Sequence, residues 1–493
     1  MRKKIKKHHL LLLFLFCQVV FTTLYGQEKI YPPEIEKKIK EVENNLGLWV
    51  HVEGASNKKT LQERMDFYHA NGVSIAVIKD FKIEWARGYG WADSTEQRPV
   101  TTATLFQAGS ISKSINGVGV LKLVQDKRLN LYADINDYLK TWKFPYDSLS
   151  KDKKITLANL LSHTAGLTIH GFPGYEKGDT IPALTFVLDG KRPANTQAVR
   201  SAFEPDLKYQ YSGGGTTISQ LILQDITGKP YDVFMWENVL NPTGMKNSFY
   251  TQPPSDDKQK LMATAYYNDG KEVKGKYHIY PEQAAAGLWT NPSDLASYII
   301  ETQLAFQGKS SKVLSQETTK VRLTPFVDSV AALGVFINRR GEQTYFQHGG
   351  VDEGFVAQYF GSMQGGNGVV VMANTYNTAI LNEIINSVAT VYDWKGFYNP
   401  QIKKVIEVNN DTLKTYLGEY KVANTTLSIK NADNGLAMYR GSSKMKLNFI
   451  SDADFFIVEI PGAEFRFTKD SQNKVDGINQ KRGSNIVKIN KIK

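Results

Sequence analysis

Strand-like segments at both ends of a long, mostly helical stretch are the strongest constraint on the fold. Residues 72–78 and 81–86 are apolar runs on either side of the polar pair Lys79-Asp80, which predicts a β-hairpin. Helical patterns and loops fill most of the chain from about 130 to 310. Further strand-like segments, separated mainly by glycine-containing turns, follow at 333–338, 343–348, 354–360 and 369–373. This order predicts an α/β (α+β) fold in which both ends of the domain complete one antiparallel sheet around a helical insertion.

The chain is long enough for more than one domain. Its 493 residues exceed the roughly 250–300 at which one hydrophobic core usually stops growing. A large domain is predicted over 60–397, after a helical lead-in at 27–59. Near the end, short strands flank the turns Asn434-Gly435 and Pro461-Gly462, which predicts a small all-β, barrel-like domain over 405–493.

The first 26 residues have the pattern of a secretory signal peptide. Five basic residues are followed by an apolar segment at 10–21 and the small residue Gly26. An uncleaved anchor is the alternative, but the apolar segment is short for one, so no integral span is expected after the signal is removed. The only cysteine, Cys17, follows the bulky Phe16 rather than the small residue expected before a lipid-modified cysteine. We therefore predict an exported bacterial protein, periplasmic or secreted, without a thiol nucleophile.

Charge gives little support for nucleic-acid binding. The net charge of +11 falls to +6 without residues 1–26, and residues 401–493 carry that whole excess, with 16 basic and 10 acidic residues. The body between them is balanced. A solvated basic face explains the excess, with weak attraction to an anionic envelope surface as the alternative. The expected partner is a small-molecule or peptide substrate, and the oligomeric state stays open.

Ser110 and Lys113 are the first candidate catalytic pair. They lie where the extended segment 106–109 gives way to a helix with apolar residues along one stripe, and residues three apart share a helix face. A serine at a helix N-terminus lies near free backbone N–H groups, and a buried lysine can lose its proton and activate the hydroxyl. The same Ser-x-x-Lys spacing recurs elsewhere, for example at Ser443/Lys446, so the spacing alone is a weak signal.

Two later motifs complete a recognisable set. Tyr211-Ser212-Gly213 precedes a predicted helix, and His348-Gly349-Gly350 lies between two predicted strands. In this order and spacing, over about residues 60–395, the chain resembles the serine β-lactamase and penicillin-binding protein superfamily, specifically its class C-like serine hydrolase branch. Leu160-Leu-Ser-His-Thr-Ala-Gly-Leu167 and Ala285-Ala-Gly-Leu288 add to the resemblance.

The resemblance implies a role for each residue. Ser110 would attack a carbonyl carbon and become acylated, while Lys113 and Tyr211 would move its proton to the leaving group and later activate water. His348 would support Tyr211 and orient the substrate. The backbone N–H groups of Ser110 and Val351 would form the oxyanion hole. No metal or cofactor is implied.

The glycines of the motifs bear on the substrate. Gly349 and Gly350 are expected to leave room for the substrate beside the strand. Gly213 stands where the family usually has asparagine, and His348 stands where many true β-lactamases have lysine. The predicted function is acyl transfer on amides or esters, such as D-amino-acid peptides related to the cell wall, with β-lactams as possible pseudo-substrates. The alternatives are a carboxylesterase for small acyl esters and a catalytically weak binding or regulatory protein.

Each candidate residue also has a structural interpretation. Ser110 can be only an N-cap, Tyr211 only a packing aromatic, and His348 only a turn residue at a strand end. Tyr209 is a rival to Tyr211. His163, which has no carboxylate at ligand spacing, is interpreted as a structural turn histidine rather than a zinc ligand.

Overall fold

The computed structural model describes residues 29–423, 425–432, 435–441 and 443–492, so the predicted signal peptide lies outside the described residues. The chain divides into two compact units. Of the described residues, the first contains those up to 39 together with 70–338 and 345–376, and the second contains those of 40–69, 339–344 and 377–492. Within the described part of the chain, every helix is too short or too polar to span a bilayer.

A seven-stranded sheet forms the framework of the first unit. Its strand order is β4-β3-β2-β10-β9-β8-β7, and β2 pairs antiparallel with both β3 and β10. Strands from the two ends of the domain are therefore neighbours, as predicted. The bounds are β2 (Gly72–Lys79), β3 (Lys82–Asp93), β4 (Arg98–Pro99), β7 (Phe336–Arg340), β8 (Gln343–Asp352), β9 (Phe355–Ser362) and β10 (Gly368–Ala373).

Strand β8 differs from the prediction. It was expected to end at His348, before a turn at Gly349-Gly350, but it continues to Asp352. Both glycines pair with β9, opposite Gln358 and Ala357. The chain turns only at Gly354, whose φ is +72°. A glycine pair can be extended as readily as turned, so the sequence did not distinguish the two conformations.

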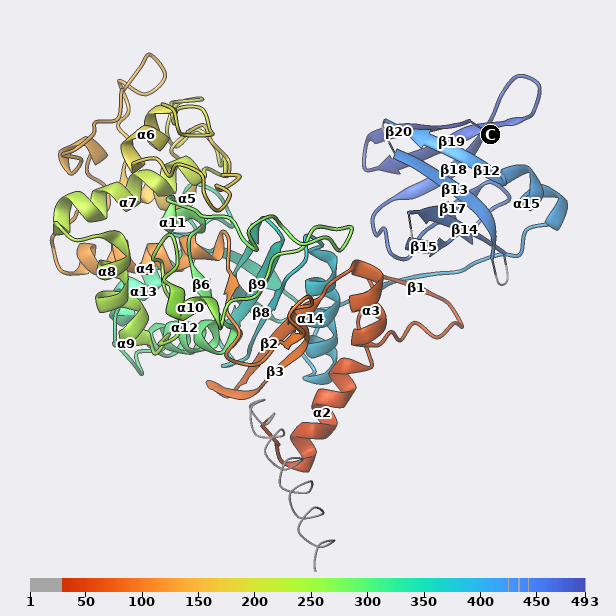
Figure 1. Ribbon diagram of the computed structural model, residues 1–493, viewed down its shortest axis with the longest axis horizontal. Helices are drawn as coiled ribbons and strands as arrows, with labels where there is room; N and C mark the ends of the chain where they lie inside the picture. Colours follow the sequence, from red (N-terminus) through yellow and green to blue (C-terminus); the bar gives the residue numbers. More distant parts are fainter. Residues whose placement is uncertain (1–28, 424, 433–434, 442, 493) are drawn as a thin grey trace, which may run out of the picture. The chain divides into compact units, whose positions relative to one another are not determined.

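The helical insertion lies on one side of strands β2, β3, β8 and β9 (Figure 1). A two-stranded β5-β6 sheet, Phe106–Gln107 with Trp289–Thr290, also belongs to this unit. The helices are α4 (Ile111–Gln125), η1 (Ile135–Asp137), α5 (Leu157–Ser162), α6 (Leu184–Asp189), α7 (Gly213–Thr227), α8 (Tyr231–Met235), η2 (Trp236–Leu240), α9 (Asn241–Thr243), α10 (Asp256–Gln259), α11 (Gln283–Ala286), α12 (Pro292–Phe306) and α13 (Gln316–Arg322). Helix α12 begins after its N-cap Asn291, whose side chain accepts a hydrogen bond from the Asp294 N–H.

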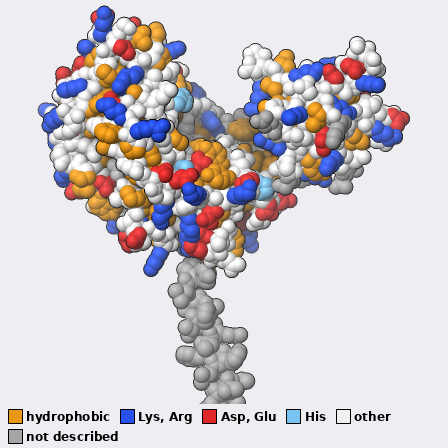
Figure 2. Space-filling view, turned by 45° about the horizontal axis from the view of Figure 1, so that its top comes forward, with side chains coloured by type: hydrophobic (Ala, Val, Ile, Leu, Met, Phe, Trp, Pro, Cys, Tyr) orange, Lys and Arg blue, Asp and Glu red, His pale blue; other side chains and the backbone are white. Residues whose placement is uncertain are grey.

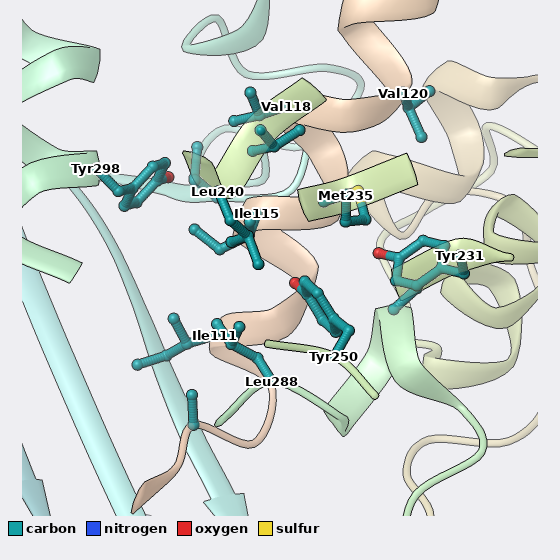
Figure 3. Packing of buried hydrophobic residues seen from close by; sticks show 14 of the residues in the cluster. Ile111, Ile115, Val118, Val120, Tyr231, Met235, Leu240, Tyr250, Leu288 and Tyr298 are labelled. Atoms are coloured by element: carbon teal, nitrogen blue, oxygen red, sulfur yellow. The ribbon is translucent and has the colours of Figure 1, made fainter. Parts of the chain in front are cut away.

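Helix α4 runs through the centre of this unit. The sequence predicted one apolar stripe, but most of the helix surface is buried, including small and polar residues. Figure 3 shows Ile111, Ile115 and Val118 among side chains from other segments, such as Met235 and Tyr250. A helix buried on several sides is held firmly, which fixes the residues at its first turn.

The second unit contains a nine-stranded antiparallel sheet. Its order is β15-β14-β13-β12-β20-β19-β18-β17-β16. Strands β15 and β16 lie at opposite ends of this order but are separated in sequence only by Leu447, so the sheet curls into a barrel-like form. The bounds are β12 (Gly418–Val422), β13 (Thr425–Ala432), β14 (Gly435–Arg440), β15 (Ser443–Lys446), β16 (Asn448–Phe449), β17 (Asp454–Phe456), β18 (Glu464–Lys469), β19 (Val475–Arg482) and β20 (Asn485–Lys491).

The predicted β13–β14 hairpin is confirmed by its pairing. A strand was expected directly before Pro461-Gly462, but β17 ends at Phe456 and the chain continues as a loop. Inside the barrel, Tyr416 stacks on Phe467 with ring centroids 3.8 Å apart. The remaining elements of this unit are β1 (Val50–Val52), α3 (Leu61–Tyr68), β11 (Gln401–Lys403), α14 (Ala379–Val391) and α15 (Asn410–Tyr416), and α2 (Pro33–Glu43) passes from the first unit into the second.

Candidate active site

Ser110 lies at the first turn of α4, just after a sharp bend in the backbone. The bend is at Gly109, whose φ is +50°, and a Cβ atom there would lie 2.5 Å from the backbone nitrogen of Val351. Ser110 is the N-cap of α4, yet its hydroxyl makes no capping hydrogen bond. The hydroxyl is therefore not engaged by the helix and faces other partners.

Lys113 places its amine against that hydroxyl. Its Nζ lies 2.9 Å from Ser110 Oγ and donates to the Ala285 carbonyl at 2.7 Å. The side chain is only 3% exposed. Burial lowers the pKa of Lys113 to about 7, although the carboxyl of Asp352 opposes the shift. An amine with this pKa is neutral in a large fraction of molecules at neutral pH, and it can accept the serine proton.

The side chain of Tyr211 also lies beside Ser110 and Lys113. Tyr211 immediately precedes Ser212, which is the N-cap of helix α7. Lys113 Nζ lies 5.0 Å from the centre of its ring. Burial raises the pKa of Tyr211, and a hydrogen bond with Ser110 lowers it in part. The rival Tyr209 instead packs edge-on against His163, at 6.2 Å between ring centroids. The structure thus brings Tyr211 to Ser110 and gives Tyr209 a packing position.

His348 is buried within strand β8 rather than exposed in a turn. It is 3% exposed, and its ring lies 6.3 Å from that of Tyr211. Its Nδ1 lies 2.6 Å from the Gly349 carbonyl oxygen, so Nδ1 carries the proton. Nε2 is buried without a hydrogen-bond partner among the described residues. Burial and the nearby Lys113 lower the pKa of His348 to about 3, which keeps the ring neutral.

The glycines of β8 lack side chains where β8 lies close to neighbouring segments. A Cβ at Gly350 would lie 1.9 Å from the Ala108 carbonyl oxygen and 3.2 Å from the Ser110 nitrogen. A Cβ at Gly349 would lie 2.7 Å from Oε1 of Gln358. The expected reason for these glycines, room for the substrate, is thus incomplete. Gly350 lets β8 approach the turn before Ser110, which brings the backbones of Ser110 and Val351 together as an oxyanion hole requires.

Gly213 leaves no empty space beside Tyr211. A Cβ there would lie 3.0 Å from a ring carbon of Phe172 and 3.1 Å from the His170 carbonyl oxygen. That carbonyl accepts the Gly213 N–H at 3.1 Å. The loop that contains Phe172 therefore occupies the direction in which an asparagine side chain at position 213 would extend.

Two buried acids near the site were not predicted. Glu282 is fully buried, and burial raises its pKa to about 8. Burial also raises the pKa of Asp352 well above its usual range, while Lys113 and a hydrogen bond with the Gly109 N–H act against the shift. Neither acid stands at a motif position, so the sequence held no signal beyond an acidic residue in apolar surroundings. Among the described residues, no group of three or more His, Cys, Asp or Glu side chains is placed to hold a metal.

His163 was interpreted as a structural turn residue, and the structure does place it in a turn at the end of α5. Its ring also lies against Tyr211, with centroids 4.2 Å apart. The Leu160–Leu167 motif pointed to this segment but not to a contact with the tyrosine.

Comparison with known families agrees with this geometry. The model of the Beta-lactamase family matches residues 57–384, about two thirds of the chain. The chain belongs to the Beta-lactamase family. The matched range includes Ser110, Lys113, Tyr211 and His348.

The chain is similar to curated proteins at low identity and over part of its length. Protein flp from Staphylococcus aureus (strain N315) is 24% identical over 327 residues, which cover 64% of this chain and 62% of the relative. A Beta-lactamase from Pseudomonas fluorescens is 28% identical over 245 residues, which cover 49% of this chain and 62% of the relative. The chain thus spans less than two thirds of the length of these relatives.

Solved structures share the fold of the Beta-lactamase family. The octameric penicillin-binding protein homologue from Pyrococcus abyssi has a TM-score of 0.57 at 19% identity, covering 87% of this chain and 98% of that one. The D-amino acid amidase from Ochrobactrum anthropi SV3 has a TM-score of 0.54 at 20% identity, covering 73% of this chain and 98% of that one. At these identities the likeness establishes the fold alone.

Proposed function

We propose that this protein is an exported serine hydrolase that acts through an acyl-enzyme on Ser110. The observation that carries the proposal is the buried Lys113 amine, with its lowered pKa, 2.9 Å from Ser110 Oγ. The substrates are amides or esters, including D-amino-acid peptides of the cell-wall type, with β-lactams as pseudo-substrates. Export rests on the signal-like residues 1–26 and predicts a periplasmic or secreted protein.

In the acylation step, Ser110 Oγ forms a bond to the substrate carbonyl carbon and transfers its proton to neutral Lys113. The carbonyl oxygen gains the negative charge, which the N–H groups of Ser110 and Val351 stabilise. As the bond to the leaving group breaks, Tyr211 donates its phenolic proton to that group and recovers a proton from Lys113. Water then attacks the acyl group through the same steps in reverse, which releases the acid and restores Ser110.

The surroundings of Gly213 favour a second candidate, a carboxylesterase for apolar acyl groups. Position 213 offers no side-chain amide, and the ring of Phe172 lies beside it. An apolar surface recognises a hydrocarbon acyl group better than a polar peptide carbonyl.

The deciding experiment is an intact mass measurement of residues 27–493 after incubation with a penicillin, with the remaining penicillin assayed in the same tube. Ser110→Ala is measured beside it. An adduct absent from Ser110→Ala supports an acyl-enzyme of the penicillin-recognising type. Loss of penicillin without an adduct indicates a β-lactamase. If neither occurs, turnover of a chromogenic ester by the wild type alone supports the esterase, and equal turnover by Ser110→Ala contradicts the proposal.

N-terminal sequencing of the protein from the envelope of an expressing bacterium tests export. Processing near Gly26 is expected, and an intact Met1 in a cytoplasmic fraction contradicts it.

A further inference from the structure

His163 is connected to the chain on both sides of Tyr211. Its carbonyl oxygen accepts the Gln210 N–H at 2.8 Å, and its ring Nδ1 accepts the Ser212 N–H at 3.2 Å. One residue therefore fixes the backbone immediately before and immediately after the tyrosine. Such a pair of contacts removes most of the freedom that a loop tyrosine would otherwise have.

The same histidine also covers the face of the tyrosine ring. The two rings are 4.2 Å apart between centroids and inclined by 34°. Phe336 extends this packing, at 6.4 Å from His163 and 6.5 Å from Tyr211. His163 is 4% exposed, so the contact is shielded from water. The phenol ring thus has one fixed plane, which directs its oxygen toward the Ser110 side of the site.

The contact requires a neutral ring with a defined tautomer. Because Nδ1 accepts a hydrogen bond, the ring proton belongs on Nε2. Burial, followed by the nearby Lys113 and His348, lowers the pKa of His163. The acceptor is therefore retained across the pH range in which Lys113 loses its proton.

We infer that His163 is a positioning residue that holds Tyr211 in the geometry for donating its proton to the leaving group. The inference rests on the proposed acyl-enzyme function. It assigns His163 no contact with the substrate and no proton transfer of its own. Its effect is on the orientation of one ring, and general acid catalysis depends strongly on that orientation.

A purely structural role is the competing explanation, since His163 also ends α5 with a left-handed φ of 60°. His163→Asn separates the two roles. Asparagine tolerates a left-handed φ and offers an amide oxygen to the Ser212 N–H, but it has no ring to pack on Tyr211. His69 provides a matched control, because it ends α3 in the same conformation, with φ 50°. His69→Asn should leave all rates within about twofold of the wild type.

The readout is the dependence on the leaving group. p-Nitrophenyl butyrate releases a phenolate that needs no proton, whereas ethyl butyrate releases an alkoxide that does. Both esters form the same butyryl-enzyme, so the leaving group affects only acylation, which kcat/KM reports. For His163→Asn we expect kcat/KM on the ethyl ester to fall by about tenfold or more beyond any loss on the nitrophenyl ester. Rates are counted per Ser110 site labelled by a fluorophosphonate, so misfolded protein does not contribute. Equal losses on the two esters would overturn the inference.

A double-mutant cycle provides the second test. Tyr211→Phe should show the same selective loss on the ethyl ester, and His163→Asn should add little to it because the phenol is already absent. If the rate loss of the double mutant on the ethyl ester equals the product of the two single-mutant losses, the inference is also overturned. Failure of the proposed function is recognised separately, because Ser110→Ala would then turn over both esters like the wild type, or the wild type would turn over neither.

Discussion

The second unit buries Arg64, Glu383 and Tyr68 together, and each is hydrogen-bonded to the other two at 2.5–2.9 Å. Burial alone would lower the pKa of Arg64, but the ion pair with Glu383 outweighs it and raises the pKa. The first unit also buries polar groups around Ser110. There, atoms of Glu282, Asp352 and His348 lack hydrogen-bond partners among the described residues.

The degree of pairing decides how each cluster behaves. A fully paired cluster retains its charges, and losing one partner is costly because the remaining charge is stranded. An incompletely paired cluster shifts pKa values toward neutral forms and leaves donors and acceptors for another molecule. The pairing in the second unit is therefore expected to serve stability, and under the proposed function the incompletely paired groups of the first unit serve reactivity. On the surface, by contrast, Figure 2 shows basic and acidic side chains interspersed over the visible face.

The largest effect on the rate is expected from replacing Ser110 in the first unit. Ser110→Ala should reduce kcat/KM on a chromogenic ester by more than roughly a thousandfold, because the covalent step is lost. Its melting temperature should change little. Ser443→Ala, which removes a serine at the same spacing from a lysine in the barrel, is the matched control and should keep full activity. A retained rate in Ser110→Ala would contradict the assignment.

Breaking the paired cluster should have the opposite outcome. Glu383→Gln leaves the Arg64 charge unpaired and should lower the free energy of unfolding by roughly 3–5 kcal/mol. Rates per labelled Ser110 site should stay near those of the wild type. Asp411→Asn removes an exposed pair with Lys414 and should cost less than about 1 kcal/mol in urea denaturation. Comparable losses in the two variants would show that the cluster is not a stability element.

The protonation of Lys113 should make the rate depend on pH. The reactive form is the neutral amine, and burial lowers the pKa of this lysine to about 7. Below that pH the protonated fraction grows, so kcat/KM should fall about tenfold for each pH unit. Above it the rate should level off. A profile that stays flat from pH 5 to 8 would exclude Lys113 as the base.

Glu282 should make the stability of the fold depend on pH. Burial raises its pKa to about 8, while the unfolded chain has a value near 4.5. Between these values the folded state holds a proton that the unfolded state releases, so stability falls as pH rises from about 5 to 8. Glu282→Gln should remove that slope, because an amide does not titrate in this range, so its stability relative to the wild type should grow as the pH rises toward 8. The urea denaturation midpoints of the wild type and of Glu282→Gln at about pH 5 and pH 8 measure this dependence. The same decrease in midpoint in both proteins would contradict the prediction.

Much of the sheet and the central residues could be predicted because their signals are local. Alternating or apolar runs beside turns gave most of the strands, and Ser110, Lys113, Tyr211 and His348 stand in short motifs. The Arg64–Glu383 pair could not be found this way, because its members are 319 residues apart. Burial of Glu282 and the extended form of Gly349-Gly350 depend on neighbours brought in by the fold. For His163, the sequence predicted the turn, but the contact of its ring with Tyr211 is a tertiary contact that the sequence did not indicate.

The short end strands of the barrel bear on how this chain behaves at high concentration. Unpaired strand edges invite other chains to add to a sheet and begin aggregation. Here β15 has four residues and β16 two, and β15 presents exposed Lys444 and Lys446. So little edge, flanked by charge, gives a neighbouring molecule a poor template for adding a strand. Growth of the sheet by edge-to-edge pairing between molecules is therefore disfavoured when the protein is concentrated.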